Sequence, residues 1–121
     1  MSASEAAAAF NACINARDLE ALAVRMTDDH KFIDTAGAEI SGKAACVAAW
    51  RAFFDAFPDY ENVFKRVIER GDTVIVEGYA RCTDARLAGP ALWSAKIARD
   101  RVREWRVWED TPANRTTLGL V

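Results

Sequence analysis

Asp34 is the residue of this sequence whose type and position best suit chemistry. We predict a short strand over 31–35, and side chains alternate between the faces of a strand, so His30, Phe32 and Asp34 share one face. If Phe32 points into an apolar interior, the other two do so as well. A carboxylate at the mouth of an apolar space is partly desolvated, which raises its proton affinity toward the range of a general base. The alternative is that Asp34 caps the turn that follows it or pairs with an arginine.

His30 is the only histidine in the chain. It could act as an acid or base with Asp34, although four residues of strand would separate the two by about 13 Å. The alternative is a histidine that satisfies the turn at the start of the strand. A single histidine and three cysteines without a CxxC pair give no metal-ligand spacing, and there is no glycine-rich phosphate loop. We therefore expect neither a metal nor an organic cofactor.

Aromatic side chains form the second group of candidates. Four tryptophans are more than a core of this size requires, and indole suits a pocket wall because it is large, rigid and partly polar. The alternative is an ordinary core together with an aromatic surface between subunits. The substrate-binding candidates are Phe10, Phe32, Trp50, Phe54, Phe57, Tyr60, Tyr79, Trp93 and Trp105.

The elements that must position these residues are helices in the first half and strands in the second, an order typical of an α+β fold. A curved antiparallel sheet buries one face, and only the helices can cover it, so we expect a cone-shaped roll with a conical space under a long N-terminal helix and a third, amphipathic helix. Ser2 with Glu5 forms a capping-box pattern, and Ser41 is the N-cap candidate of the third helix. The expected helices lie near 2–14, 18–26 and 42–57, the strands over 31–35, 60–68, 73–82, 91–98 and 102–110, and a last helical turn follows 111.

The orientation of the strand at 73–82 stays open. Glu77 and Tyr79 share one face and would be polar groups in the conical space if that face were concave. Val74 and Val76 lie on the rival, more apolar face.

Composition narrows the classes of function. The length fits one domain, 1–121, and a formal net charge of −2 gives no long-range field for nucleic acid or an anionic membrane. The arginines over 99–106 alternate with acidic residues, which favours a self-paired surface. The longest wholly apolar run, 6–10, is too short to span a bilayer, and the N-terminus lacks the basic region of a secretory signal. We expect a cytoplasmic protein with reduced cysteines.

Several segments, in order along nearly the whole chain, resemble the nuclear-transport-factor-2-like superfamily, in particular its SnoaL-like and ketosteroid-isomerase-like branches. The segments are 15–20, 26–34, 40–43, 57–60, 70–74 and 104–110. The resemblance implies one SnoaL-like domain and a homodimer, and outward-facing aromatic residues of the last hairpin independently suggest surface buried between subunits. The fold hosts isomerases, cyclases, dehydratases, epoxide hydrolases and non-enzymatic binders.

The spacing of Asp28, Asp29 and Asp34 resembles the ketosteroid isomerases, in which the last carboxylate is the base. Their oxyanion donors do not carry over to this chain. Phe10 stands where those enzymes have a tyrosine, and Trp93 stands near the position of their protonated aspartate. The departures argue against steroid isomerisation.

The sequence leaves two classes of function open. One is a cofactor-independent isomerase, cyclase or hydratase that acts on a small apolar carbonyl compound, with Asp34 as general base and His30 as a second catalytic candidate. The other is a non-catalytic ligand-binding or dimerisation module of the same fold. An open cavity beside Asp34 favours the first class, whereas a cavity closed by Trp50 and Phe54 favours the second. Val107 stands where epoxide-hydrolase-like relatives carry a carboxylate, which argues against that mechanism.

Overall fold

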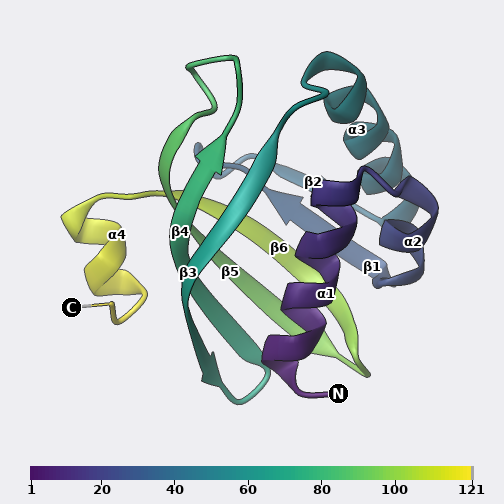
Figure 1. The fold of residues 1–121 in the computed structure, drawn as a ribbon. Helices are drawn as coiled ribbons and strands as arrows, with labels where there is room; N and C mark the ends of the chain where they lie inside the picture. Colours follow the sequence, from purple (N-terminus) through teal and green to yellow (C-terminus); the bar gives the residue numbers. More distant parts are fainter. Residues whose placement is uncertain (121) are drawn as a thin grey trace.

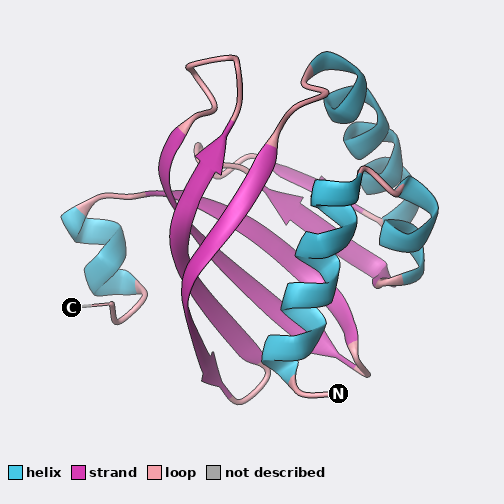
Figure 2. Ribbon diagram, viewed as in Figure 1, coloured by secondary structure: helices cyan, strands magenta, loops and turns pink. Residues whose placement is uncertain are grey.

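One curved sheet with helices on both sides forms the structure, a computed structural model that describes residues 1–120 (Figure 1). The elements are α1 (Ala3–Ala16), α2 (Leu19–Val24), β1 (Met26–Ile33), β2 (Glu39–Ser41), α3 (Lys43–Ala56), β3 (Glu61–Arg70), β4 (Thr73–Arg81), β5 (Gly89–Ala98), β6 (Arg101–Glu109) and α4 (Pro112–Thr117). Helices α1, α2 and α3 cover the concave side of the sheet, and α4 lies against the convex side (Figure 2). The expected α+β cone-shaped roll is confirmed.

The sheet is mixed, not wholly antiparallel as expected. Its strand order is β2-β1-β6-β5-β4-β3, and β1 pairs with β6 in parallel, with Phe32 opposite Trp105. The other neighbours are antiparallel. The cause is the path of the chain, which leaves β1 through β2 and α3 for the far edge of the sheet. Three consecutive hairpin connections then bring β6 back beside β1 in the same direction.

Three boundaries around β1 differ from the prediction. The strand begins at Met26 and not at 31, because Met26 is the register partner of Val102 and the Val102 amide donates to the Arg25 carbonyl at 2.8 Å. The residues predicted as a helix end and a turn therefore belong to the strand, because β1 pairs with β6 from Met26 onward. Ser41 belongs to β2, a three-residue strand that is too short to show periodicity, so Gly42 is the N-cap of α3.

Helix α1 begins as predicted. The Ser2 hydroxyl accepts a hydrogen bond from the Glu5 amide, and the Glu5 carboxylate accepts one from the Ser2 amide, which completes the capping box. The helix buries Phe10 and Ile14 against the concave face. None of the helices within residues 1–120 has the length and apolarity needed to cross a membrane.

The packing partners of β4 settle which of its faces is concave. Val74 and Val76 are buried in the main core together with Phe10 of α1. Ile75 packs on the opposite side, in a second cluster with Leu118, which follows α4. The more apolar face of β4 is therefore the concave one.

Strand β3 bends where its register with β4 shifts between Phe64 and Arg66. Such a bulge adds a residue to one strand and increases the local twist. Gly78 of β4 lies opposite Phe64, and a Cβ atom at position 78 would lie 2.0 Å from the backbone oxygen of Val63. Glycine therefore allows β3 to cross close over β4 and curl toward α1 (Figure 1).

Candidate functional site

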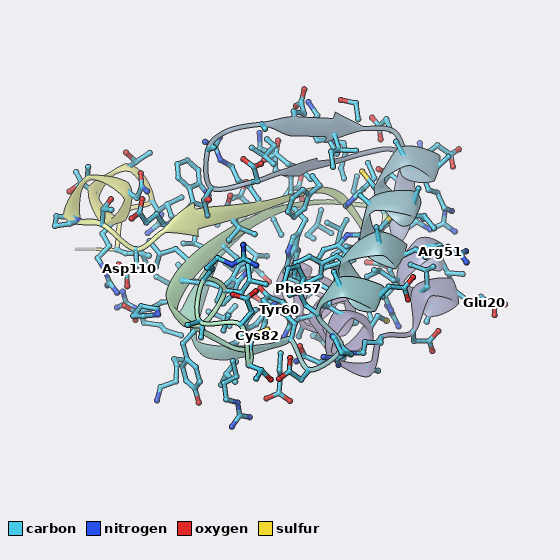
Figure 3. The ribbon with its side chains drawn as sticks, turned by 90° about the horizontal axis from the view of Figure 1, so that it is seen from above. Glu20, Arg51, Phe57, Tyr60, Cys82 and Asp110 are labelled. Carbon is cyan, nitrogen blue, oxygen red and sulfur yellow. The ribbon has the colours of Figure 1, made fainter. Side chains whose placement is uncertain are left out.

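A cavity of about 720 Å³ lies between α3 and the concave face of the sheet. This volume is in the range of small-molecule sites. Exposed side chains of Arg86 and Glu109 contribute to its lining, so the cavity reaches the surface. Figure 3 looks along this end of the molecule and shows Tyr60 between α3 and the sheet, with Phe57 beside it.

Part of the predicted aromatic set lines this cavity: Phe32, Trp50, Tyr60, Trp93 and Trp105. The remaining four aromatic candidates lie elsewhere. Phe10 lies in the core behind Trp105, with ring centroids 4.7 Å apart, Phe54 packs on Trp50 at 5.5 Å, and Phe57 packs on Phe53 at 5.0 Å. Tyr79 lies on the convex face, because strand alternation places it with Ile75, and Lys65 Nζ is 6.0 Å from its ring centroid.

Asp34 lines the cavity directly after the end of β1, and it also caps the following turn. Its Oδ1 accepts hydrogen bonds from the amides of Ala36 and Ala38, both at 2.9 Å. Within residues 1–120 no group donates a hydrogen bond to Oδ2. The backbone thus holds one carboxylate oxygen and leaves the other available to a ligand.

Tyr60 is a buried phenol in the cavity wall, with 9% of its surface exposed. Its ring meets Phe53 edge-on at 4.8 Å. Burial raises the pKa of Tyr60 to about 12, because a phenolate would lose its hydration, and Cys82 raises this pKa further while the Asn62 amide opposes both. The hydroxyl therefore keeps its proton near neutral pH and can donate a hydrogen bond to a ligand oxygen.

A buried amide network holds the start of β3 against α1 and was not among the predicted site residues. The Asn62 amide donates to Asn15 Oδ1 at 2.8 Å, Asn15 Nδ2 donates to the Asn62 carbonyl at 2.9 Å, and Asn62 Nδ2 donates to Asn11 Oδ1 at 3.1 Å. Asn62 also lines the cavity. One sequence feature could have predicted this network. Asn11 and Asn15 lie one helical turn apart beside apolar residues, so both face the buried side of α1.

Four tryptophans contribute to the lining of the cavity: Trp50, Trp93, Trp105 and Trp108. The Nε1 atoms of Trp50, Trp93 and Trp105 each expose less than 1 Å² and have no hydrogen-bond partner within residues 1–120. An indole N–H that is closed off in this way reaches a ligand only if the ring moves. The cavity interior is therefore apolar except where Tyr60 and Asn62 lie.

His30 lies in the core and not in the cavity wall. Its Nδ1 is 2.6 Å from the Val102 carbonyl oxygen, so Nδ1 carries the proton and donates it. Phe10 of α1 covers the ring at a centroid distance of 5.5 Å, and Nε2 has no partner within the described residues. His30 shares the inward face of β1 with Phe32, but it does not line the cavity to which Phe32 and Asp34 contribute.

We expect the protein to lose stability as the pH falls from 6.5 toward 5.5. Burial lowers the pKa of His30 below its ordinary value of 6.5, so the unfolded chain binds a proton in this window that the native state does not. The free energy of unfolding therefore decreases on acidification and recovers above pH 6.5. Urea unfolding at several pH values measures this slope, and the ring resonances of the single histidine report its titration.

The His30→Gln variant is the control for this pH dependence. It lacks a group that titrates near neutral pH, so its unfolding free energy should be flat from pH 6.5 to 5.5. An equal slope in both proteins would assign the effect to other groups.

Charged groups occur only at the opening of the cavity. Glu109 continues the concave face of β6 after Trp105, and no cation within residues 1–120 pairs with it. Arg86 is bound to Asp84 through Nε at 3.0 Å and Nη2 at 2.6 Å. No cluster of three histidine, cysteine or acidic side chains that could hold a metal ion occurs in residues 1–120.

Comparison with known proteins identifies relatives of this fold. The family model of the SnoaL-like domain matches residues 7–111, whereas no curated protein matches the chain. A LEH-like epoxide hydrolase of M. tuberculosis is 18% identical, with a TM-score of 0.78 over 89% of this chain and 82% of its own. A protein of Shewanella putrefaciens described as a SnoaL-like polyketide cyclase is 17% identical, with a TM-score of 0.78 over 98% and 86%.

TerC, co-crystallised with polyporic acid, is 21% identical to this chain, with a TM-score of 0.74 over 98% of this chain and 99% of its own. At these identities the structures show a shared fold and no shared activity. The family match covers most of the sequence and confirms the resemblance found in its segments. The chain belongs to the SnoaL-like family of the nuclear-transport-factor-2-like superfamily.

Proposed function

We propose that this protein binds a small, largely apolar carbonyl compound and moves a proton on it with Asp34 as the general base. One observation supports this proposal. A carboxylate with a free oxygen, on Asp34, and a protonated phenol, on Tyr60, line the same largely apolar cavity. A base together with a hydrogen-bond donor for the carbonyl oxygen is what enolisation requires of a protein.

In the proposed step, Oδ2 of Asp34 takes a proton from the carbon next to the carbonyl group. The electrons of that C–H bond form a carbon–carbon double bond, and the carbonyl oxygen becomes an enolate oxygen. The Tyr60 hydroxyl donates a hydrogen bond to this oxygen as its charge develops. Return of the proton to a different carbon completes an isomerisation. Attack of the enolate carbon on a second carbonyl of the same molecule, followed by protonation of the new alkoxide, completes a cyclisation.

The relatives support a ligand of this class. One similar structure is described as a polyketide cyclase and another holds polyporic acid. We do not extend the epoxide hydrolase activity of the M. tuberculosis relative to this chain, because Val107, which replaces the expected carboxylate, lines the cavity.

Enolisation can be measured without the natural substrate, through exchange of the acidic hydrogens of 2-tetralone for deuterium in D2O, followed by proton NMR. We expect the native protein to accelerate this exchange and the Asp34→Asn variant to reduce the protein-dependent rate at least about a hundredfold. An asparagine oxygen can still accept the hydrogen bonds from Ala36 and Ala38, so the fold should be preserved. Tyr60→Phe should lower the rate as well, since it removes the donor.

The matched control is Asp29→Asn, which alters an exposed carboxylate on β1, the strand that precedes Asp34, and should leave the exchange rate unchanged. Exchange at the native rate in Asp34→Asn would refute the assignment of the base. The turn-capping bonds of Asp34 favour a second candidate, a ligand-binding module in which this carboxylate is structural. Binding of 2-tetralone to the native protein without exchange would support that candidate.

A further inference from the structure

We infer that Arg17, at the end of α1, is a positioning residue that holds Tyr60 so that its hydroxyl meets the carbonyl oxygen of the ligand. The inference rests on the proposed function, in which this hydroxyl donates a hydrogen bond to the enolate oxygen. Arg17 is not among the residues that line the cavity, so it acts on the reaction only through Tyr60.

The side chain of Arg17 connects the end of α1 to the residue that precedes β3. Its Nη1 donates to the Asn15 carbonyl at 2.8 Å, and its Nη2 donates to the Tyr60 carbonyl. Because the donors of a guanidinium group lie in one plane, the two bonds fix these carbonyl groups relative to each other. Arg17 makes no ion pair within residues 1–120, so its polar contacts there are with backbone carbonyls.

The backbone before and at the start of β3 needs partners from outside the sheet. β3 is an outer strand, and alternate residues of such a strand direct their backbone N–H and C=O groups away from the sheet. Asn15 binds both of these groups on Asn62, and Arg17 binds the carbonyl of Tyr60. The end of α1 thus fixes the peptide plane that follows Tyr60, and with it the direction in which the phenol enters the cavity.

The backbone conformation of Arg17 also indicates a role for its side chain. Its φ is +54° and its ψ is +35°, the left-handed geometry with which α1 ends. Glycine adopts this geometry readily, whereas a residue with a side chain is strained in it. Such strain persists where the surrounding structure enforces it, often at functional sites. The contact of the guanidinium with the Tyr60 carbonyl is what arginine provides here and glycine cannot.

The Arg17→Gly variant tests this inference, because glycine suits the turn and lacks the guanidinium group. The dependence of the exchange rate on the concentration of 2-tetralone gives kcat and KM. We expect kcat to fall about tenfold and KM to change less than about twofold, because the donor is misplaced while the apolar wall stays. Arg17→Lys is a second variant that keeps the positive charge but cannot bridge both carbonyls in this way, and its kcat should fall as well.

A double-mutant cycle with Tyr60→Phe distinguishes positioning from a general effect on the fold. If Arg17 acts through the Tyr60 hydroxyl, Arg17→Gly should lower kcat less than about twofold when position 60 is phenylalanine. A residue that only stabilises the fold would lower kcat by the same factor in both backgrounds. The matched control is Arg25→Gly at the end of α2, which removes an arginine that makes no ion pair within residues 1–120 and should leave kcat unchanged.

The possible outcomes separate this inference from the proposed function. A native kcat in Arg17→Gly, or an equal reduction in both backgrounds of the cycle, would overturn the inference and leave the proposed function intact. If the native protein does not accelerate exchange, or if Tyr60→Phe alone leaves kcat unchanged, the proposed role of Tyr60 is wrong and the inference is wrong with it.

Discussion

The Gly78→Ala variant is expected to lose at least about 4 kcal/mol of unfolding free energy, or to fail to fold. The added methyl carbon would lie 2.0 Å from the Val63 carbonyl oxygen, which is a backbone atom and cannot move aside as a side chain could. Relief of the contact requires β3 and β4 to separate, which breaks hydrogen bonds of the ladder that shapes the cone. Urea unfolding followed by circular dichroism measures the loss.

Gly71→Ala is the comparison for this variant. Gly71 lies in the turn between the same two strands with a φ of +60°, and a Cβ atom there meets open space. Alanine at this position should cost about 1–2 kcal/mol, through the left-handed conformation alone. If both variants unfold at the same urea concentration, the close approach of β3 to Gly78 does not limit stability.

Truncation of Trp105 to alanine should cost about 3–5 kcal/mol. The side chain is 1% exposed and packs between Phe10 at 4.7 Å and Phe64 at 6.2 Å, so its loss leaves a void that the curved sheet cannot collapse to fill. Because Trp105 also lines the ligand cavity, the variant should bind 2-tetralone more weakly. Chemical denaturation and dialysis measure the two effects.

Trp108→Ala provides the contrast on the same strand. Trp108 is half-buried on the convex face, where Arg106 lies 3.7 Å from its ring centroid and its Nε1 donates to Ser94 Oγ at 2.8 Å. We expect a smaller decrease in the unfolding free energy, because removal of a half-buried side chain takes away less buried apolar surface. If Trp108→Ala lowers the unfolding free energy as much as Trp105→Ala does, burial on the concave side contributes no more to stability than burial on the convex side.

Local patterns sufficed to predict most elements. The capping box of Ser2 and Glu5, and the alternation that places Phe32 and Asp34 on one face, depend on neighbours within a few residues. The direction of β6 relative to β1 depends on the whole path between them, so the parallel pairing could not be read from either strand. The orientation of β4 likewise depended on Leu118, which is distant in sequence and covers Ile75.

For the candidate site as well, local patterns predicted some residues, whereas contacts between distant segments decided others. The third helix and the last hairpin supplied aromatic residues that do line the cavity, Trp50 and Trp93 among them. His30 shares the face of Phe32 as alternation requires, but the position of α1 decides that Phe10 covers it. The sequence of β3 alone does not indicate a role for Asn62, because this role arises only when β3 lies against the amides of α1.

The bulge in β3 has a consequence for solubility. β3 is an outer strand of the sheet, and an outer strand with free backbone groups can recruit another chain and seed aggregation. Its bend at 64–66 and the exposed Lys65 and Arg66 make a poor template for such recruitment. The other outer strand, β2, is only three residues long. The irregularity that curls the sheet around its ligand space thus also keeps separate molecules from joining edge to edge.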